Sequence, residues 1–287
     1  MVWTNYHGHC NYCDGKENPE AYIEAAIEKG LAAYGFSSHG PLPFPTKWAI
    51  QDDKVKQYLS DINKIREKHR DKLEIYLGME IDYIPGLVEP INNLSKKYNL
   101  DYTIGSIHFV DKLPDGTPWN IDGSHELFME GVQKIFDGDI KKAVKRYYHK
   151  VREMIKKDCP DVLGHFDKIK MQLINHVPFD ETEDWYREEI ADTLETIAQS
   201  DAIVEINTRA HYKHNLKNVY PSKWIIRSMA ELDIPVIIQS DAHQPDEITK
   251  SFDITAKMLG YAGYDHVFSL IDGEWQEFEF DRTGLKI

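Results

Sequence analysis

The chain has 287 residues, of which 41% are hydrophobic, and its 34 basic and 48 acidic side chains give a net charge of −14. That length and composition suit one domain with its own core, so we expect residues 1–287 to form a single domain. The acidic balance argues against a nucleic-acid polymer as partner, because the field of the protein would repel a polyanion.

Short β-rich runs alternate with amphipathic stretches from one end of the chain to the other. The eight runs are residues 2–7, 31–39, 73–82, 101–109, 161–167, 202–208, 234–243 and 266–280. Alternation of this kind implies parallel strands joined by crossover helices. Seven or eight such units favour a closed α/β barrel over an open sheet.

The intervening helices carry their own signals. Residues 52–70 and 139–157 place apolar side chains at helical spacing. Asn18, which precedes a proline, fits an N-cap followed by proline at the first helical position. Gly30 and Gly260 fit the positions of helix C-caps.

Metal-competent side chains lie at the carboxyl ends of six of the first seven runs. These residues are His7 and His9, His39, Glu80, His108, His165, and Asp241 and His243. In a parallel barrel all strand ends of one polarity meet at one rim, where such barrels keep their active sites. The sixth run is the exception, because it ends in Thr208 and Arg209.

The spacing of these residues favours a metal centre. Strand residues two apart point to the same side, so His7 and His9 can face one ion, as can Asp241 and His243. With Asp14 the set has nine members, whereas one catalytic zinc needs about three protein ligands. We therefore predict a site for two or three Zn²⁺, Mn²⁺ or Fe²⁺ ions. Five other histidines are expected to have no such role: His69, His125, His149, His176 and His266.

The sequence resembles the PHP (polymerase and histidinol phosphatase) superfamily, and within it the histidinol-phosphate phosphatases. The matching motifs are HGHCNYCDG, GFSSHGP, GMEIDY, GSIHF, LGHFD, EINT and SDAHQP, which follow one another between residues 7 and 245. This resemblance implies a distorted (β/α)7 barrel of the PHP type that holds three divalent metal ions. It also implies a histidinol-phosphatase, a phosphoric monoester hydrolase of histidine biosynthesis.

Carried over by position, the resemblance divides the nine donors among three ions. The implied sets are His7, His9, Glu80 and Asp241 for the first ion, Glu80, His108 and His165 for the second, and Asp14, His39 and His243 for the third. A hydroxide held between the first two ions would attack phosphorus in line. Asp241, His243 and Glu80 are therefore expected to be catalytic, and Asp167 is a further candidate for the general acid or for a partner of a ligating histidine.

The phosphate-binding residues are less clearly indicated. The phosphatase branch often carries an arginine a few residues after the G-H-x-D motif, where this chain reads DKIKMQ. Lys170, or alternatively Lys168, would have to take its place as a point charge rather than a bidentate fork. Arg209 is a second candidate for a phosphate contact, although a salt bridge at the rim explains it equally well.

The substrate is expected to be a small phosphate ester, recognised by rim loops. Residues 110–137 lack the strand–helix pattern and read as a long insertion at the rim. Together with residues 210–221 they could supply acids or aromatic rings for an imidazole and an amine. The sequence does not specify an oligomeric state.

Three other functions compete with this interpretation. An amidohydrolase-type barrel also opens with H-x-H, but it usually lacks the glutamate of the third strand and the closing D-x-H pair. A PHP phosphodiesterase or nuclease acting on small nucleotides is compatible with the charge. A non-catalytic metal-binding protein is disfavoured because the ligand set is complete.

The remaining signals concern the compartment. The three cysteines, Cys10, Cys13 and Cys159, are too few for a disulfide framework and indicate a reducing environment. The Cys10-x-x-Cys13 spacing favours neither a zinc ribbon, which needs a second pair, nor a redox motif. No signal peptide or membrane-spanning run is evident, so we expect a cytoplasmic protein.

Overall fold

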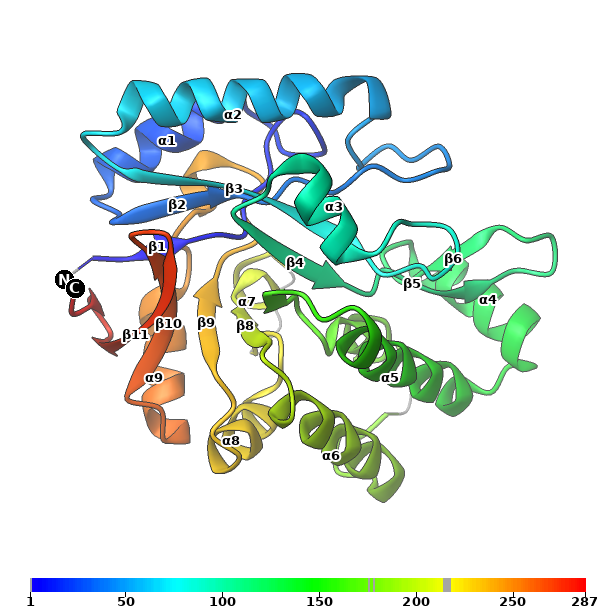
Figure 1. Ribbon diagram of the computed structural model, residues 1–287. Coiled ribbons are helices and arrows are strands. Elements are labelled where there is room, and N and C mark those ends of the chain that lie inside the picture. The colour runs from blue at the N-terminus through cyan, green and yellow to red at the C-terminus, as the bar shows by residue number, and fades with distance from the viewer. Residues whose placement is uncertain (1, 175, 178, 214–217) are drawn as a thin grey trace.

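A computed structural model of the protein describes residues 2–174, 176–177, 179–213 and 218–287. Within these residues, seven parallel strands pair in the order β1-β2-β3-β4-β7-β8-β9 (Figure 1). The strands are β1 Thr4–Asn5, β2 Ala33–Phe36, β3 Glu74–Asp82, β4 Tyr102–Ser106, β7 Val162–Leu163, β8 Ile203–Asn207 and β9 Val236–Gln239. The expected α/β fold, a distorted (β/α)7 barrel, is confirmed.

The first and last strands of the barrel meet just beyond their carboxyl ends. A single bridge joins Gly8 to Ala242. Below it, the side-chain oxygen of Gln239 accepts hydrogen bonds from the backbone N–H groups of Tyr6, at 2.6 Å, and His7, at 3.2 Å. A side chain therefore takes the place of ladder bonds here, and the segment after β1 lies beside the segment after β9.

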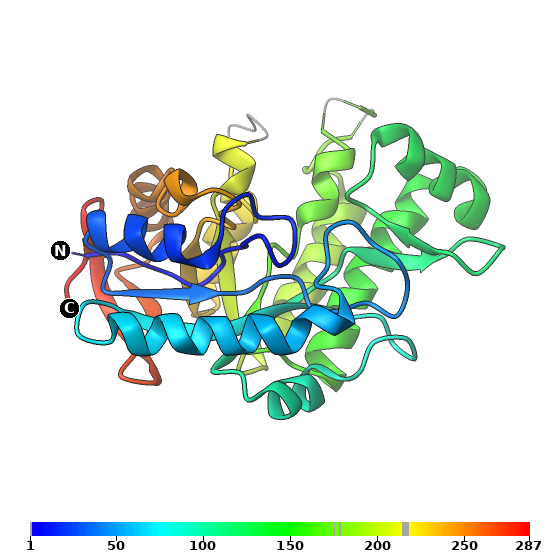
Figure 2. The same cartoon turned by 90° about the horizontal axis from the view of Figure 1, so that it is seen from above.

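Helices cover the outside of the barrel (Figures 1 and 2). They are α1 Pro19–Glu28, α2 Val55–His69, α3 Ile91–Tyr98, α5 Ile140–Lys157, α6 Asp184–Ala198, α8 Lys223–Glu231 and α9 Phe252–Ala262, with a short α7 at Arg209–Tyr212. The 3₁₀ turns are η1 Asp52–Lys54, η2 Lys168–Gln172 and η3 Pro245–Glu247. The helices predicted over 52–70 and 139–157 are confirmed as η1 with α2 and as α5.

Two of the three predicted helix ends are confirmed. Asn18 is the N-cap of α1, where its side chain accepts from the N–H of Ala21, and a proline follows it. Gly30 adopts a positive φ of 68° just after α1. Gly260 was wrongly expected to end α9, which continues to Ala262 and stops before Gly263, the glycine with a φ of 112°.

Two additions extend the barrel. The insertion predicted after the fourth strand folds as a hairpin of β5 Phe109–Lys112 and β6 Pro118–Asn120, followed by helix α4 His125–Phe136, which the sequence pattern did not reveal. The last β-rich run forms an antiparallel sheet of β10 His266–Ile271, β11 Glu274–Asp281 and β12 Gly284–Leu285. Among the described residues, none of the helices is both long and apolar enough to cross a lipid bilayer.

The barrel interior is filled by side chains from all seven strands or the residues directly after them, including Tyr6 and Tyr102. The ring of Tyr102 lies so close to Gly78 that a Cβ there would be 2.4 Å from the ring. Its hydroxyl donates to the carbonyl of Tyr6 at 2.5 Å. The interior is thus solid, and only the residues beyond the carboxyl ends of the strands are left to form a site.

Candidate metal centre

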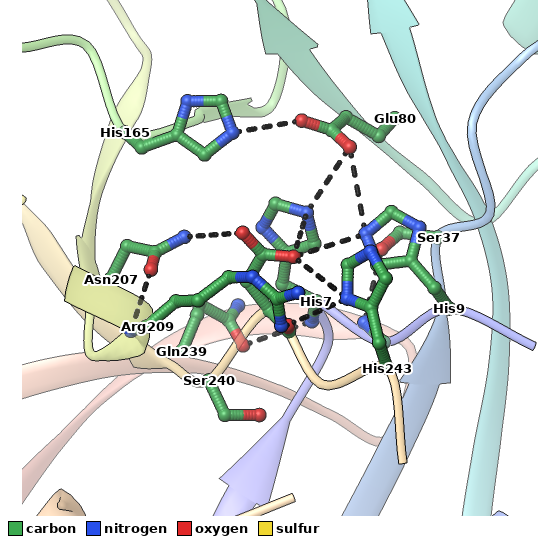
Figure 3. A network of polar contacts seen from close by, with 12 residues as sticks. His7, His9, Ser37, Glu80, His165, Asn207, Arg209, Gln239, Ser240 and His243 are labelled. Atoms are coloured by element: carbon green, nitrogen blue, oxygen red, sulfur yellow. Dashed lines mark hydrogen bonds and ion pairs between the residues drawn. The ribbon is translucent and has the colours of Figure 1, made fainter. Parts of the chain in front are cut away.

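Glu80, near the end of β3, faces several of the predicted donors, among them His7, His9 and His165 (Figure 3). Its Oε1 lies 3.0 Å from His165 Nε2 and 3.5 Å from His108 Nε2. Its Oε2 lies 2.9 Å from a ring nitrogen of His39 and 3.4 Å from His7 Nε2. One buried carboxylate therefore faces histidines from four other strand ends.

Three donors meet where the barrel closes. The Nε2 atoms of His7 and His9 lie 3.8 and 3.3 Å from Oδ1 of Asp241. Asp241 itself has a positive φ of 53°, a left-handed conformation that aspartate tolerates better than most residues. This juxtaposition depends on the closure between β9 and β1, which places the two segments side by side.

A second group lies nearer the solvent. Asp14 reaches His243 Nε2, at 3.2 Å, and His39 Nε2, at 3.8 Å, through its two carboxylate oxygens. His9 belongs to this group as well as to the first, with its Nδ1 3.9 Å from Asp14. All nine predicted donors thus lie in overlapping groups around one centre.

This donor set fits divalent cations. Two ligands that each lie about 2.1 Å from one zinc ion are about 3.4 Å apart at the tetrahedral angle, close to several of the distances above. Within the described residues, the buried Nε2 atoms of His7, His9 and His108 make no hydrogen bond, although such atoms are nearly always paired. Imidazole nitrogens that face carboxylates without a hydrogen-bond partner are the arrangement expected of ligands for Zn²⁺, Mn²⁺ or Fe²⁺.

The donors open onto a cavity of about 260 Å³. Its lining residues are Asp14, His39, Trp48, Glu80, Asp122, His165, Lys168, Met171, Arg209, Asp241 and His243. Trp48 packs edge-on against the ring of His39, with centroids 4.8 Å apart. Asp122, from the insertion, and Lys168, from η2, pair at 3.0 Å. Trp48, Asp122 and Met171 carry no strand-end signal, so the sequence did not reveal them.

Lys170, predicted to contact phosphate, is placed elsewhere by the structure. It is fully buried, and its ammonium donates to Asp167 Oδ2 at 2.7 Å and to Ser222 Oγ and the Val219 carbonyl at 2.8 Å. Neither Lys170 nor Asp167 lines the cavity. In the 3₁₀ turn η2, Lys168 faces the cavity and Lys170 the core, so the geometry favours the alternative, Lys168.

Arg209, the second candidate for a phosphate contact, lines the cavity and also makes contacts that support the backbone. Its Nη1 donates to the carbonyl of Asp241 at 2.8 Å and lies 3.6 Å from Glu247. The hydroxyl of Tyr212 donates to the neighbouring Ser240 carbonyl at 2.8 Å. The short helix α7 thereby supports the left-handed backbone at Asp241. Part of the predicted rim segment 210–221, residues 214–217, lies outside the described residues.

Two carboxylates that contact the ligating histidines, Asp82 and Glu205, were not predicted from the sequence either. Asp82 lies 3.0 Å from Nδ1 of His108, and Glu205 lies 2.5 Å from Nδ1 of His7. Burial lowers the pKa of His108, but the negative charges of Asp82, Asp122 and Glu80 together outweigh burial and raise the pKa to about 9. A proton must therefore leave this ring when a cation binds to it. Side chains two residues apart on a strand share a face, so the position of Glu205, two residues before Asn207 near the end of β8, could have indicated that it faces the centre.

Four of the five histidines that were expected to have no role at the metal centre make their contacts elsewhere in the structure. His69 lies 2.6 Å from Glu20, His266 lies 2.8 Å from Asp265, and His125 stacks on His176 with centroids 4.2 Å apart. All three cysteines are free thiols. Burial raises the pKa of Cys10 to about 11, which disfavours a reactive thiolate.

Comparison with known proteins places this fold and site in a family. Residues 5–209 match the model of the PHP domain. A probable histidinol-phosphatase of Deinococcus radiodurans is 25% identical over 256 residues, which cover 88% of this chain and 90% of that protein. The histidinol-phosphatase of Bacillus subtilis is 25% identical over 262 residues, which cover 86% of this chain and 96% of that protein.

Solved structures agree on the fold. The putative histidinol phosphatase HisK of Listeria monocytogenes superposes with a TM-score of 0.76 at 22% identity, covering 88% of this chain and 99% of that one. A histidinol phosphate phosphatase of Lactococcus lactis, in complex with zinc, L-histidinol and phosphate, gives a TM-score of 0.70 at 18% identity and covers 99% of both chains.

The barrel and its strand-end donors define a hydrolase of the PHP type. The chain belongs to the PHP domain family, and the curated relatives named above are histidinol-phosphatases. It is an enzyme, a phosphoric monoester hydrolase, as the sequence predicted.

Proposed function

We propose that the protein hydrolyses L-histidinol phosphate to L-histidinol and phosphate, using three divalent metal ions. The observation that carries this proposal is the cavity on which the donors converge, because Lys168 and Arg209 add positive charge to the same lining. Two cations beside a metal centre suit a phosphoryl group with its two negative charges. The relatives named histidinol-phosphatase, and the zinc, L-histidinol and phosphate in one of the related structures, support the choice of substrate.

We assign the donors to the ions as the resemblance implies. His7, His9 and Asp241 would hold the first ion with Glu80, which also serves the second ion beside His108 and His165. Asp14, His39 and His243 would hold the third. The groups of facing donors support this division in part. His9 lies close to both the first and the third set, His39 also faces Glu80 and His108, and His7 also faces Glu80 and His165. When bound, such ions acidify a water molecule held between them and neutralise the charge of phosphoryl oxygens.

The chain's own side chains would orient the substrate. Lys168 and Arg209 would contact the phosphoryl oxygens, and the Asp122 carboxylate would hold Lys168 in place. Among the described residues of the cavity lining, Asp122 is the one acid outside the nine donors, and it is therefore our candidate for the substrate amine as well. Trp48 and Met171 would pack against the imidazole ring.

The leaving oxygen needs a proton. Asp241 and His243 both line the cavity, whereas Asp167 is buried behind it. We therefore assign proton transfer to one of the first two, which would pass to the leaving oxygen the proton that the attacking water molecule gives up, and leave Asp167 a structural role.

A substrate panel tests the proposal. Phosphate release from L-histidinol phosphate should exceed release from sugar phosphates, nucleotides and bis(p-nitrophenyl) phosphate by at least about 100-fold in kcat/KM, a difference of about 2.7 kcal/mol. Preference for the diester, or hydrolysis of cyclic amides in place of phosphate esters, would contradict the proposal.

A further inference from the structure

Strand β8 is the one barrel strand that ends without a predicted metal ligand. Near its carboxyl end the strand instead carries two buried polar residues, Glu205 and Asn207, neither of which has exposed surface. Because they are two apart on a strand, their side chains point to the same side, toward the centre. Burying polar side chains this deep is costly unless every group is bonded, so their bonding partners indicate what they support.

The Glu205 carboxylate is shared between two ligand-bearing segments. Its Oε1 lies 2.5 Å from Nδ1 of His7, beyond the end of β1. Its Oε2 accepts from the backbone N–H of His165, beyond the end of β7, at 2.8 Å. The same oxygen accepts from the side-chain amide of Asn207 at 3.1 Å.

Asn207 extends this connection to a third segment. Its Nδ2 donates both to Glu205 and, at 3.2 Å, to Oδ2 of Asp241, beyond the end of β9. Its Oδ1 accepts from the N–H of Arg209 at 2.9 Å, which fixes the orientation of the amide. The side-chain amide of Asn207 therefore links two carboxylates, and it cannot flip without losing these hydrogen bonds.

We propose that Glu205 and Asn207 form a brace that positions His7, His165 and Asp241 for the metal ions. This inference rests on the proposed function and extends it to residues that touch no ion. An acceptor at Nδ1 of His7 keeps the proton on that nitrogen and leaves the lone pair of Nε2 free for a cation. Asn207 occupies one oxygen of Asp241 and leaves Oδ1 facing His7 and His9.

The brace is selective among the proposed ions. It contacts ligands of the first ion and of the second, but none of Asp14, His39 and His243. Its loss should therefore weaken two sites and spare the third, which a general loss of stability would not do.

Glu205→Gln is the sharpest variant, because it changes one oxygen to an amide nitrogen. If the new nitrogen faces His165 and Asn207, it opposes two donors. If it faces His7 instead, it drives the proton of that ring to Nε2 and removes a ligand. Asn207→Ser removes the link to Asp241 with a smaller change in packing. Asp158→Asn is the matched control, because Asp158 is a buried carboxylate that accepts from the N–H of Ile91 at 2.7 Å, away from the centre.

Cobalt(II) is the probe. The measurements are its visible absorption spectrum on the protein and its affinity in competition with a chelator, alongside urea unfolding. We expect Glu205→Gln and Asn207→Ser to weaken part of the cobalt binding by about 10–100-fold and to change the spectrum. Asp158→Asn should lower stability and leave both metal readouts unchanged.

If folded Glu205→Gln binds cobalt with wild-type affinity and spectrum, the proposed brace is wrong. If that variant does not fold, the same result in Asn207→Ser would overturn the proposal. If the wild-type protein binds no cobalt and releases no phosphate, the proposed function fails, and the brace with it.

Discussion

The ammonium of Lys168 lies 3.0 Å from the carboxylate of Asp122, and both groups line the cavity beside the proposed metal centre. The pair connects the turn after β7 to the insertion after β4. We expect Lys168→Met to raise KM for the phosphate ester by about 10–100-fold, because a hydrogen bond to a charged group is worth about 1.5–3 kcal/mol. Steady-state kinetics measure this effect. Lys168→Arg should retain most of the activity, and an unchanged KM in Lys168→Met would remove Lys168 from the site.

Substitution of Lys170, two residues after Lys168, should lower the stability of the protein rather than raise KM. The ammonium of Lys170 and the carboxylate of Asp167 form a buried pair, so Lys170→Met leaves Asp167 without its counter-ion. We expect a loss of about 3–5 kcal/mol in the free energy of unfolding, measured with urea. Lys170→Met with Asp167→Asn should recover part of that loss. A variant as stable as the wild type, but with raised KM, would return Lys170 to the phosphate site.

Metal affinity should depend on pH. The pKa of His108 is raised to about 9, so this ring releases a proton when a cation binds, and protons compete with the metal below that pH. We expect the apparent Kd for zinc to rise by about tenfold for each pH unit between 8 and 6 if one proton is displaced. Isothermal titration calorimetry in two buffers of different ionisation enthalpy gives the number of protons that are released when zinc binds. A Kd that is constant over this range would show that the ligands bind metal without losing a proton.

Much of this site was predictable from the sequence, for a topological reason. Parallel strands bring their carboxyl ends to one rim, so His7, His39 and Glu80 could be placed together from strand runs alone. The division between Lys168 and Lys170 was not predictable, because in a 3₁₀ turn small changes in direction decide which side chain faces the core. The insertion over residues 110–137 was expected to supply acids, but Asp122 could not be singled out within it because the segment has no periodic pattern.

Glu205 illustrates a different limit. A buried glutamate on a strand carries no sequence signal that separates a bracing carboxylate from a ligand, and only its 2.5 Å contact with His7 does so. Gly260 shows the same limit for a helix end. Two glycines lie three residues apart, and the end of α9 is set by Gly263, which adopts the left-handed conformation.

The most direct measurement concerns Glu80, whose two oxygens face histidines from four strand ends. Glu80→Gln, reconstituted with zinc or manganese, should bind fewer ions by elemental analysis than the wild type and should release phosphate from L-histidinol phosphate at least about 1,000-fold more slowly, equivalent to about 4 kcal/mol of transition-state stabilisation. A Glu80→Gln protein with three bound ions and wild-type turnover would contradict the proposed metal centre.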